Sequence, residues 1–222
     1  MASFWNKIYL WIYSSFKFIV FLLYDLLFSL LNNLYIWRYR RAQIPDNLSG
    51  KIVLITGASD GLGMLTMEHL VKRNATIIMT CRNIEKGNKV REDILSKCNS
   101  NAQIHLFQLD LSSQISVRSA AKEILSKFER LDVLINNGGI MKSPKMLSED
   151  GHEMHLATNH LGHFSLTNAL LPLLYKSDQA RVVTLSSSAN LLGKMHYDDL
   201  NLNKSYSPLL AYGQSKLANI LF

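Results

Sequence analysis

Short apolar runs alternate with longer segments of helical periodicity, and this alternation is the feature that most limits how the chain can fold. The runs are rich in β-branched residues and apolar on both faces, as in strands covered by helices on both sides. The pattern predicts a mostly parallel sheet with right-handed crossovers, a doubly wound α/β fold. The predicted strands are Ile52–Thr56, Ala75–Thr80, Ile104–Leu109, Leu131–Asn136 and Arg181–Ser186, and the helical segments between them include Leu62–Lys72, Glu85–Lys97 and Val117–Phe128.

The first forty-four residues differ from the rest of the chain. The window Phe18–Trp37 is twenty residues long and contains a single charged residue, Asp25. Twenty helical residues at about 1.5 Å each span a hydrocarbon core of roughly 30 Å. A cleaved signal peptide would have a shorter apolar core and small residues at a cleavage site. We therefore predict an N-terminal membrane-anchoring helix within residues 1–44 and a second domain over residues 45–222.

Basic residues around this window predict its orientation. Three arginines between residues 38 and 41 outweigh Lys7 and Lys17, so the rule that cytoplasmic flanks are basic places the C-terminal part in the cytosol. Lys17 and Asp25 are costly at depth in a bilayer, and the alternative is a helix that lies in the membrane surface. Both alternatives predict membrane lipid as a partner.

The net charge of +7 has to be divided along the chain before it indicates a partner. Residues 1–44 hold five basic residues against one acid, which leaves nineteen against sixteen in the remainder. The excess therefore belongs mainly to the predicted anchor, and we predict no nucleic-acid partner. The two cysteines, Cys81 and Cys98, cannot form a disulfide framework, which fits the reducing side of a membrane.

A glycine-rich turn follows the first predicted strand. Residues 57–63 read Gly-Ala-Ser-Asp-Gly-Leu-Gly, and ligand sites in doubly wound sheets lie where the strands end. Glycine permits positive φ and lets the backbone approach a pyrophosphate at a helix N-terminus. A tight turn with close packing is the alternative for three glycines alone. Their place between a strand and a helix favours a dinucleotide site.

The next two strand ends bear on which dinucleotide is bound. The second predicted strand ends Thr80-Cys81-Arg82, without an acid to accept from a ribose 2′-hydroxyl, whereas an arginine suits a 2′-phosphate. This favours NADP(H) over NAD(H), although Arg82 could instead be a surface residue. Asp110, which precedes Leu111, either hydrogen-bonds the adenine or caps a helix that starts near Ser112.

A tyrosine and a lysine four residues apart, Tyr212 and Lys216, lie in a helix predicted to begin near Pro208. Residues at this spacing share one helical face. A free phenol has a pKa of about 10, and a nearby positive charge lowers it, which suits proton transfer. The pair alone is more often an exposed aromatic beside a solvated lysine. Two further strand ends add Asn136-Asn137-Gly138-Gly139 and Ser186-Ser187-Ser188.

In this order and approximate spacing, these motifs resemble the short-chain dehydrogenase/reductase family over nearly all of residues 50–222. The chain is most similar to the retinol dehydrogenase branch, and also to the WW-domain-containing oxidoreductase. The segments that carry this resemblance are Cys81–Gly87, Thr158–Phe164, Arg181–Ser187 and Tyr206–Phe222.

The resemblance implies a Rossmann-type doubly wound sheet and an NADP-dependent oxidoreductase that interconverts an apolar alcohol and its aldehyde or ketone. A retinoid, a steroid or a lipid carbonyl fits as substrate. It further implies attachment to the endoplasmic reticulum membrane with the catalytic domain facing the cytosol, and it leaves a homo-oligomer open.

The resemblance also implies roles for single residues. Tyr212 would exchange a proton with the substrate oxygen, and Lys216 would lower the pKa of Tyr212 and hold the nicotinamide ribose. Ser187 would bind and polarise the carbonyl oxygen, and Asn159 would support a water and proton path to the lysine. Gly138 replaces the family's usual alanine, so we expect a looser turn there. The implied cofactor-binding residues are Gly57, Ser59, Gly61, Leu62, Gly63, Arg82, Asp110, Leu111, Asn137, Gly139, Tyr212 and Lys216.

Four histidines between residues 152 and 163 suggest a metal site, but their spacing is not that of His-Glu-x-x-His and no matched carboxylate accompanies them. We predict no metal, and helix-surface or packing roles for His152, His155, His160 and His163.

The family continues beyond the position of Phe222, so we expect the printed sequence to be a C-terminally truncated fragment of an enzyme. The alternative is a membrane-tethered nucleotide-binding or interaction module without turnover, because the substrate-binding C-terminal part would be absent. An unpaired strand edge would then favour pairing with another chain.

Overall fold

The computed structural model of the chain describes residue 23 and residues 45–98, 103–141 and 144–222. Apart from Leu23, the predicted membrane-anchoring segment over residues 1–44 lies outside the described residues. Among the helices of the described part, none is both long enough and apolar enough to cross a membrane.

Five parallel strands form one sheet in the order β3-β2-β1-β4-β5, which confirms the predicted α/β fold with a parallel sheet. The strands are β1 (Ile52–Thr56), β2 (Thr76–Cys81), β3 (Ile104–Gln108), β4 (Val133–Asn136) and β5 (Arg181–Thr184). The chain proceeds outward from β1 to β3 and then crosses back to β4. The strand order therefore reverses beside β1, which is where ligands bind in such sheets.

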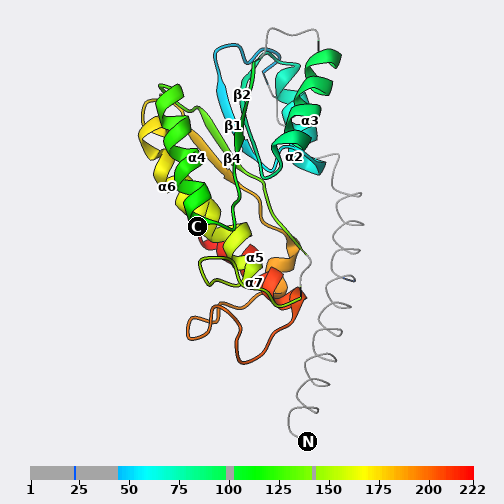
Figure 1. The fold of residues 1–222 in the computed structure, drawn as a ribbon, viewed down its shortest axis with the longest axis vertical. Coiled ribbons are helices and arrows are strands. Elements are labelled where there is room, and N and C mark those ends of the chain that lie inside the picture. Colours follow the sequence, from blue (N-terminus) through cyan, green and yellow to red (C-terminus); the bar gives the residue numbers. More distant parts are fainter. Residues whose placement is uncertain (1–22, 24–44, 99–102, 142–143) are drawn as a thin grey trace, which may run out of the picture.

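Helices cover both faces of the sheet (Figure 1). They are α2 (Gly61–Val71) and α3 (Ile84–Lys97) on one face, and α4 (Gln114–Lys127) and α6 (Gly162–Leu174) on the other. Val53 and Ile55 of β1 pack in the core beneath α2 and α3, whereas Leu54 packs in the core beneath α4 and α6. Successive side chains of a strand point to opposite faces, so the apolar run of β1 is buried on both.

The edge strand β5 differs from the prediction that all five strands are covered on both faces. Its central residues Val182 and Val183 are 43% and 44% exposed. The reason is that, among the described elements, β5 packs closely against β4 alone, whereas the other edge strand β3 is also covered by α3 and α4.

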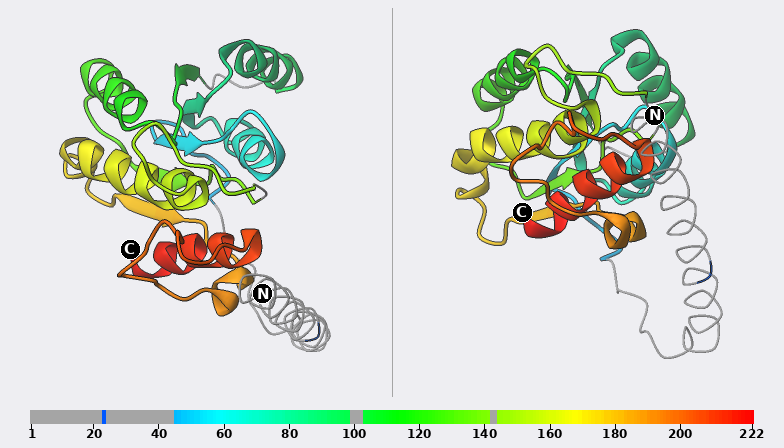
Figure 2. Two further views of the ribbon diagram at one scale, coloured as in Figure 1. Left: turned by 60° about the horizontal axis from the view of Figure 1, so that its bottom comes forward. Right: turned by 90° about the horizontal axis from the view of Figure 1, so that it is seen from below.

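The segments after β4 and β5 form the end of the molecule that carries the carboxyl ends of the strands (Figures 1 and 2). A short helix, α5 (Met154–Leu156), continues through the π-helix η1 (Ala157–Leu161) into α6. Asn159 therefore lies in a wider helical turn rather than in a regular helix, and such turns are frequent at functional sites. The last helix, α7 (Pro208–Leu221), begins at the predicted Pro208 and packs against α5 and the 3₁₀-helix η2 (Ser188–Leu192).

Candidate active site

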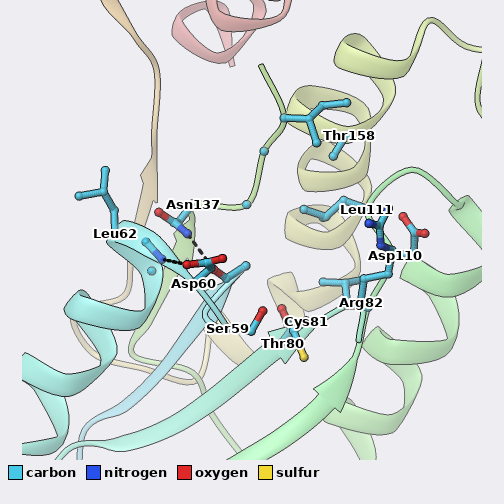
Figure 3. A pocket seen from close by; sticks show the side chains of 17 residues that line it. Ser59, Asp60, Leu62, Thr80, Cys81, Arg82, Asp110, Leu111, Asn137 and Thr158 are labelled. Atoms are coloured by element: carbon cyan, nitrogen blue, oxygen red, sulfur yellow. Dashed lines mark hydrogen bonds between the residues drawn. The ribbon is translucent and has the colours of Figure 1, made fainter. Parts of the chain in front are cut away.

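A cavity of about 530 Å³ lies at the carboxyl ends of β1 to β4 (Figure 3). This volume is within the range of cofactor and small-molecule pockets. Ten of the twelve predicted cofactor-binding residues line it: Gly57, Ser59, Gly61, Leu62, Gly63, Arg82, Asp110, Leu111, Asn137 and Gly139. The other lining residues were not predicted to bind the cofactor, and they are Asp60, Thr80, Cys81, Leu109, Gly138, Ile140 and Thr158. Most of these residues are sequence neighbours of predicted ones. Their position at strand ends was the feature of the sequence that could have indicated them.

The glycine-rich turn is packed where side chains would not fit. Gly57 has φ +64, and a Cβ on it would lie 2.8 Å from Cα of Gly138. A Cβ on Gly63 would lie 2.5 Å from the carbonyl oxygen of Gly57. At Gly61, with φ +50, a Cβ would meet nothing within 4 Å, but the backbone conformation itself favours glycine. The turn can therefore bring the N-terminus of α2 to the cavity wall, where it suits a phosphate.

Charged groups around the cavity also suit a phosphorylated dinucleotide. Arg82 follows β2 and lines the cavity, where its planar guanidinium can donate two parallel hydrogen bonds to a phosphate (Figure 3). The carboxylate of Asp60 caps α2 by accepting from Gly61 N at 2.8 Å and pairs with Lys86 Nζ at 2.6 Å. The hydrogen bond from Lys86 is the main reason that the pKa of Asp60 is lowered. The positive charge of Lys86 thus offsets the negative charge of Asp60 at the cavity.

Asp110 does not cap the helix that follows it. Ser113 is the N-cap of α4, and its side chain accepts from Ser116 N. The Asp110 carboxylate instead accepts from Ser112 N at 2.9 Å and from the Ser112 hydroxyl at 2.6 Å. The capping alternative was therefore wrong, because the helix starts at Gln114. The adenine contact of Asp110 stays a prediction.

Thr56, the last residue of β1, holds the loop after β4. Its Oγ1 accepts from Asn137 N and from Gly138 N, both at 2.9 Å, and its carbonyl accepts from Asn137 Nδ2 at 2.8 Å. A Cβ on Gly138 would lie 2.7 Å from Cδ1 of Leu111. The expectation of a looser turn at Gly138 was wrong, since this loop is tightly held. Thr56 was not among the predicted site residues, although a hydroxyl at the end of a buried strand was a usable signal.

A second cavity, of about 210 Å³, adjoins the first because four residues line both: Leu62, Asn137, Gly139 and Ile140. Tyr212 and Lys216 line this second cavity. All twelve predicted cofactor-binding residues are thus on one continuous surface. The rest of the wall of the second cavity consists of Met141, Leu185 and Ser186.

Lys216 is buried beside Tyr212. Its Nζ lies 5.7 Å from the centroid of the Tyr212 ring and donates to the carbonyl oxygen of Leu185 at 3.1 Å. Burial lowers the pKa of Lys216. The structure therefore shows the pairing that the four-residue spacing predicted.

Asn159 is fully buried between the loop after β4 and α7. Its Oδ1 accepts from Ile140 N at 2.8 Å, and its Nδ2 donates to Ile140 O and to Ser215 Oγ, both at 2.9 Å. The residue thus joins the cofactor side of the site to the helix that carries Tyr212.

The two serines after β5 have different contacts. Ser186 lines the cavity of Tyr212, and its hydroxyl donates to the carbonyl oxygen of Lys216 at 2.7 Å. The Ser187 hydroxyl accepts from Ala189 N at 3.2 Å at the start of η2. The structure therefore brings Tyr212 and Lys216 together at one cavity, whereas the role of Ser187 stays a prediction.

Two of the four clustered histidines, His155 and His163, are buried, and both contact other elements of the site. His155 Nδ1 lies 2.7 Å from Glu153 Oε1, and its ring stands edge-on to Tyr212 with centroids 6.3 Å apart. Within the described ranges, no group of three or more His, Cys, Asp or Glu side chains is arranged to hold a metal ion.

A doubly wound sheet with a glycine-lined cavity at its carboxyl edge and a tyrosine–lysine pair beside that cavity defines the class of dinucleotide-dependent oxidoreductases. Within this class, the sequence profile of the short chain dehydrogenases matches residues 51–199. The chain belongs to the short-chain dehydrogenase/reductase family.

The curated relatives of the chain include retinol dehydrogenases. The chain is 45% identical over 175 residues to retinol dehydrogenase 11 of Homo sapiens, a match that covers 79% of this chain and 55% of that protein. It is 43% identical over 197 residues to human retinol dehydrogenase 14, covering 83% of this chain and 59% of that protein. The chain thus spans little more than half the length of the curated relatives it matches.

Solved structures share the fold. An uncharacterized protein from Mycobacterium paratuberculosis is 43% identical with a TM-score of 0.71, over 82% of this chain and 63% of that one. A short chain dehydrogenase from Shigella flexneri 2a, solved in complex with NADP, is 31% identical with a TM-score of 0.62, over 78% of this chain and 69% of that one.

Proposed function

We propose that the protein is a membrane-attached, NADP(H)-dependent oxidoreductase that interconverts an apolar alcohol and its aldehyde or ketone. The observation that carries this proposal is the continuity of the two cavities, which share Leu62, Asn137, Gly139 and Ile140. A dinucleotide in the larger cavity would place its reacting end beside Tyr212 and Lys216. When bound, the nicotinamide supplies or takes up the hydride.

The protein's own residues handle the proton and the substrate oxygen. In carbonyl reduction, Tyr212 donates its phenolic proton to the oxygen as negative charge develops there. The Lys216 cation stabilises the phenolate that remains. Ser187 is our candidate for binding the carbonyl oxygen, because its hydroxyl accepts from Ala189 N and donates to no other residue in the described part of the chain.

Two observations support NADP(H) as the cofactor. Arg82 lines the cavity at the end of β2, where an NAD-specific fold usually presents an acid to the ribose. The structural relatives from Shigella flexneri and Escherichia coli were solved with NADP and with NADPH. Arg82 would hold the 2′-phosphate, and the N-terminus of α2 would hold the pyrophosphate.

An apolar substrate fits the wall around Tyr212, where Ile140, Met141 and Leu185 contribute aliphatic surface. The matched relatives carry the name retinol dehydrogenase, so all-trans-retinal is the first substrate to test. The apolar window within residues 1–44 would hold the enzyme at a bilayer, where such a substrate partitions. We place it at the endoplasmic reticulum with the catalytic domain in the cytosol, where NADPH would drive carbonyl reduction.

Replacing Tyr212 with Phe tests the assignment, because this change removes the phenolic proton and keeps the ring. We expect the rate of retinal reduction to fall by at least about 10³-fold, in line with the loss of a general acid, while the Kd for NADPH stays within about twofold. Turnover is measured from NADPH absorbance, and Kd from NADPH fluorescence.

Tyr197→Phe is the matched control, because Tyr197 is exposed and does not line the cavity of Tyr212. It should leave both quantities unchanged. Retained turnover in Tyr212→Phe would exclude the mechanism. NADPH binding by the wild-type chain without turnover of any apolar carbonyl would favour the nucleotide-binding module instead.

A further inference from the structure

His163, the second residue of α6, joins two elements that the site depends on. The side chain is buried, with 1% of the residue exposed. Its Nδ1 lies 2.9 Å from the carbonyl oxygen of Asn159 in η1, and its Nε2 lies 2.8 Å from Oγ1 of Thr56 at the end of β1. One imidazole therefore bridges the π-helix and the strand that precedes the glycine-rich turn.

The Nδ1 contact determines which ring nitrogen carries a proton. A carbonyl oxygen only accepts hydrogen bonds, so Nδ1 of His163 must donate to Asn159 O. Burial lowers the pKa of His163 to about 4, so the ring is neutral near neutral pH. A neutral imidazole has one proton, and its Nε2 is then an acceptor.

The hydrogen bonds of Thr56 lead independently to the same assignment of His163, with the proton on Nδ1 and with Nε2 as acceptor. Thr56 Oγ1 already accepts from Asn137 N and Gly138 N, which uses both of its lone pairs. Its own proton has two acceptors in reach, Ile135 O at 3.4 Å and His163 Nε2 at 2.8 Å, and the second is much the better distance. Thr56 therefore donates to His163, and every group in this buried chain is satisfied.

The two ring nitrogens lead to different halves of the site. Through Thr56, Nε2 is connected to the loop after β4, which lines the cofactor cavity. Nδ1 bonds the main-chain carbonyl of Asn159, whose side-chain Nδ2 donates to Ser215 Oγ of α7 at 2.9 Å. Ser215 Oγ in turn donates to the carbonyl oxygen of Tyr212 at 2.7 Å. The histidine thus lies between the cofactor loop and the helix that carries the proton-transfer pair.

We propose that His163 is a positioning residue with two separable functions, in which Nε2 sets the cofactor loop and Nδ1 sets the catalytic helix. The proposal deepens the function proposed above, and its turnover readout rests on that function. The two contacts can be removed one at a time. The amide of Asn reproduces a donor near the Nδ1 position, and the amide of Gln reproduces an acceptor near the Nε2 position.

The experiment compares His163→Asn and His163→Gln in the full chain. His163→Asn keeps the donor for Asn159 O and loses the acceptor for Thr56, so we expect the Kd for NADPH to rise about tenfold with kcat within about twofold. His163→Gln keeps the acceptor for Thr56 and loses the donor, so we expect kcat for retinal reduction to fall about tenfold with Kd within about twofold.

Amide hydrogen exchange gives a readout that needs no substrate. The amides of Asn137 and Gly138 should exchange faster in His163→Asn, and amides of residues 214–217 should exchange faster in His163→Gln. If the wild-type chain reduces no retinal, the proposed function fails, while the NADPH affinity and the exchange pattern still test the role of His163.

His163→Phe keeps the ring volume without either contact and should show both defects. His105→Gln is the control, because His105 lies on β3 with Gln103 as its ring partner and should show neither defect. Equal changes of Kd and kcat in the Asn and Gln variants would overturn the proposal. So would wild-type values in both.

If the His163 variants fail to fold, Thr56→Ser and Thr56→Val replace them. The serine keeps the hydroxyl and should preserve slow exchange at Asn137 and Gly138, whereas the valine should lose it. Unchanged exchange in Thr56→Val would overturn the proposal.

Discussion

Arg82 is an exposed side chain at the cavity edge, and at the scale of single residues it is the group on which the choice of dinucleotide rests. The residues at the end of β2, from Thr80 to Arg82, include no acid that would bind the ribose instead. An exposed arginine affects nucleotide affinity through its charge and the direction of its hydrogen bonds rather than through packing, so its replacement should leave the fold intact.

Replacing Arg82 with Asp should therefore weaken NADPH much more than NADH. Loss of a charge-assisted hydrogen bond and introduction of a like charge near the 2′-phosphate should raise the Kd for NADPH by about 100-fold, with NADH changed by less than about threefold. Titrations of both nucleotides measure this. Lys89→Asp makes the same charge change on α3, away from the residues that line the cavity, and is the control. Equal weakening of both nucleotides would remove Arg82 as the determinant.

At the scale of elements, the start of α6 packs against the backbone of the segment after β3 at Gly162. A Cβ on this residue would lie 2.2 Å from the carbonyl oxygen of Leu111, which lines the cavity. Backbone cannot move aside as a side-chain tip can. Only glycine lets α6 approach the segment after β3 this closely, and His163 follows directly.

Gly162→Ala should consequently destabilise the fold despite the better helix propensity of alanine. Overpacking against backbone should cost about 3 kcal/mol, against a gain of about 1 kcal/mol in propensity. Urea unfolding measures the net change in free energy. Gly87→Ala in α3 is the matched control, because the three atoms nearest its Cβ would be side-chain atoms of Cys81 and Leu106 rather than backbone atoms. A stability equal to wild type in Gly162→Ala would contradict the close contact.

At the scale of the whole molecule, the predicted anchor accounts for +4 of the net charge of +7 and would place the active site next to a bilayer. The sheet itself leaves β5 partly exposed at one edge. The predicted anchor and the exposed strand β5 both concern contacts of the protein with a membrane or with solvent, rather than the chemistry of the cavity.

We expect the full chain to remain in the membrane pellet after carbonate extraction, because about twenty apolar residues stabilise a spanning helix strongly. Release by carbonate, but not by salt, would indicate a helix lying in the surface. In sealed vesicles, added protease should degrade the catalytic part without detergent. Recovery of the chain in a detergent-free soluble fraction would contradict an anchor. Asn47, Asn74 and Asn203 each begin an Asn-x-Ser/Thr glycosylation motif, and glycans on any of them would reverse the predicted orientation.

Local patterns in the sequence were sufficient for much of the fold and the cavity. Burial on both faces of a strand requires a continuous apolar run, and a glycine at positive φ is needed wherever the turn after β1 is built. The four-residue spacing of Tyr212 and Lys216 is likewise a property of one helix. Each of these features depends on residues that are near one another in the chain, so the order of the residues is enough to reveal it.

Tertiary structure decided what depends on residues far apart in the chain. Thr56 and His163 are separated by 107 positions, and no periodicity relates them. Whether Asp110 caps a helix, which serine lines the cavity and how tightly Gly138 is packed also depended on neighbours from other elements. The sequence alone determined the strands, the glycine turn and the tyrosine–lysine pair. Packing determined the buried hydrogen bonds that hold them together, because a buried polar group must find its partner wherever the fold places one.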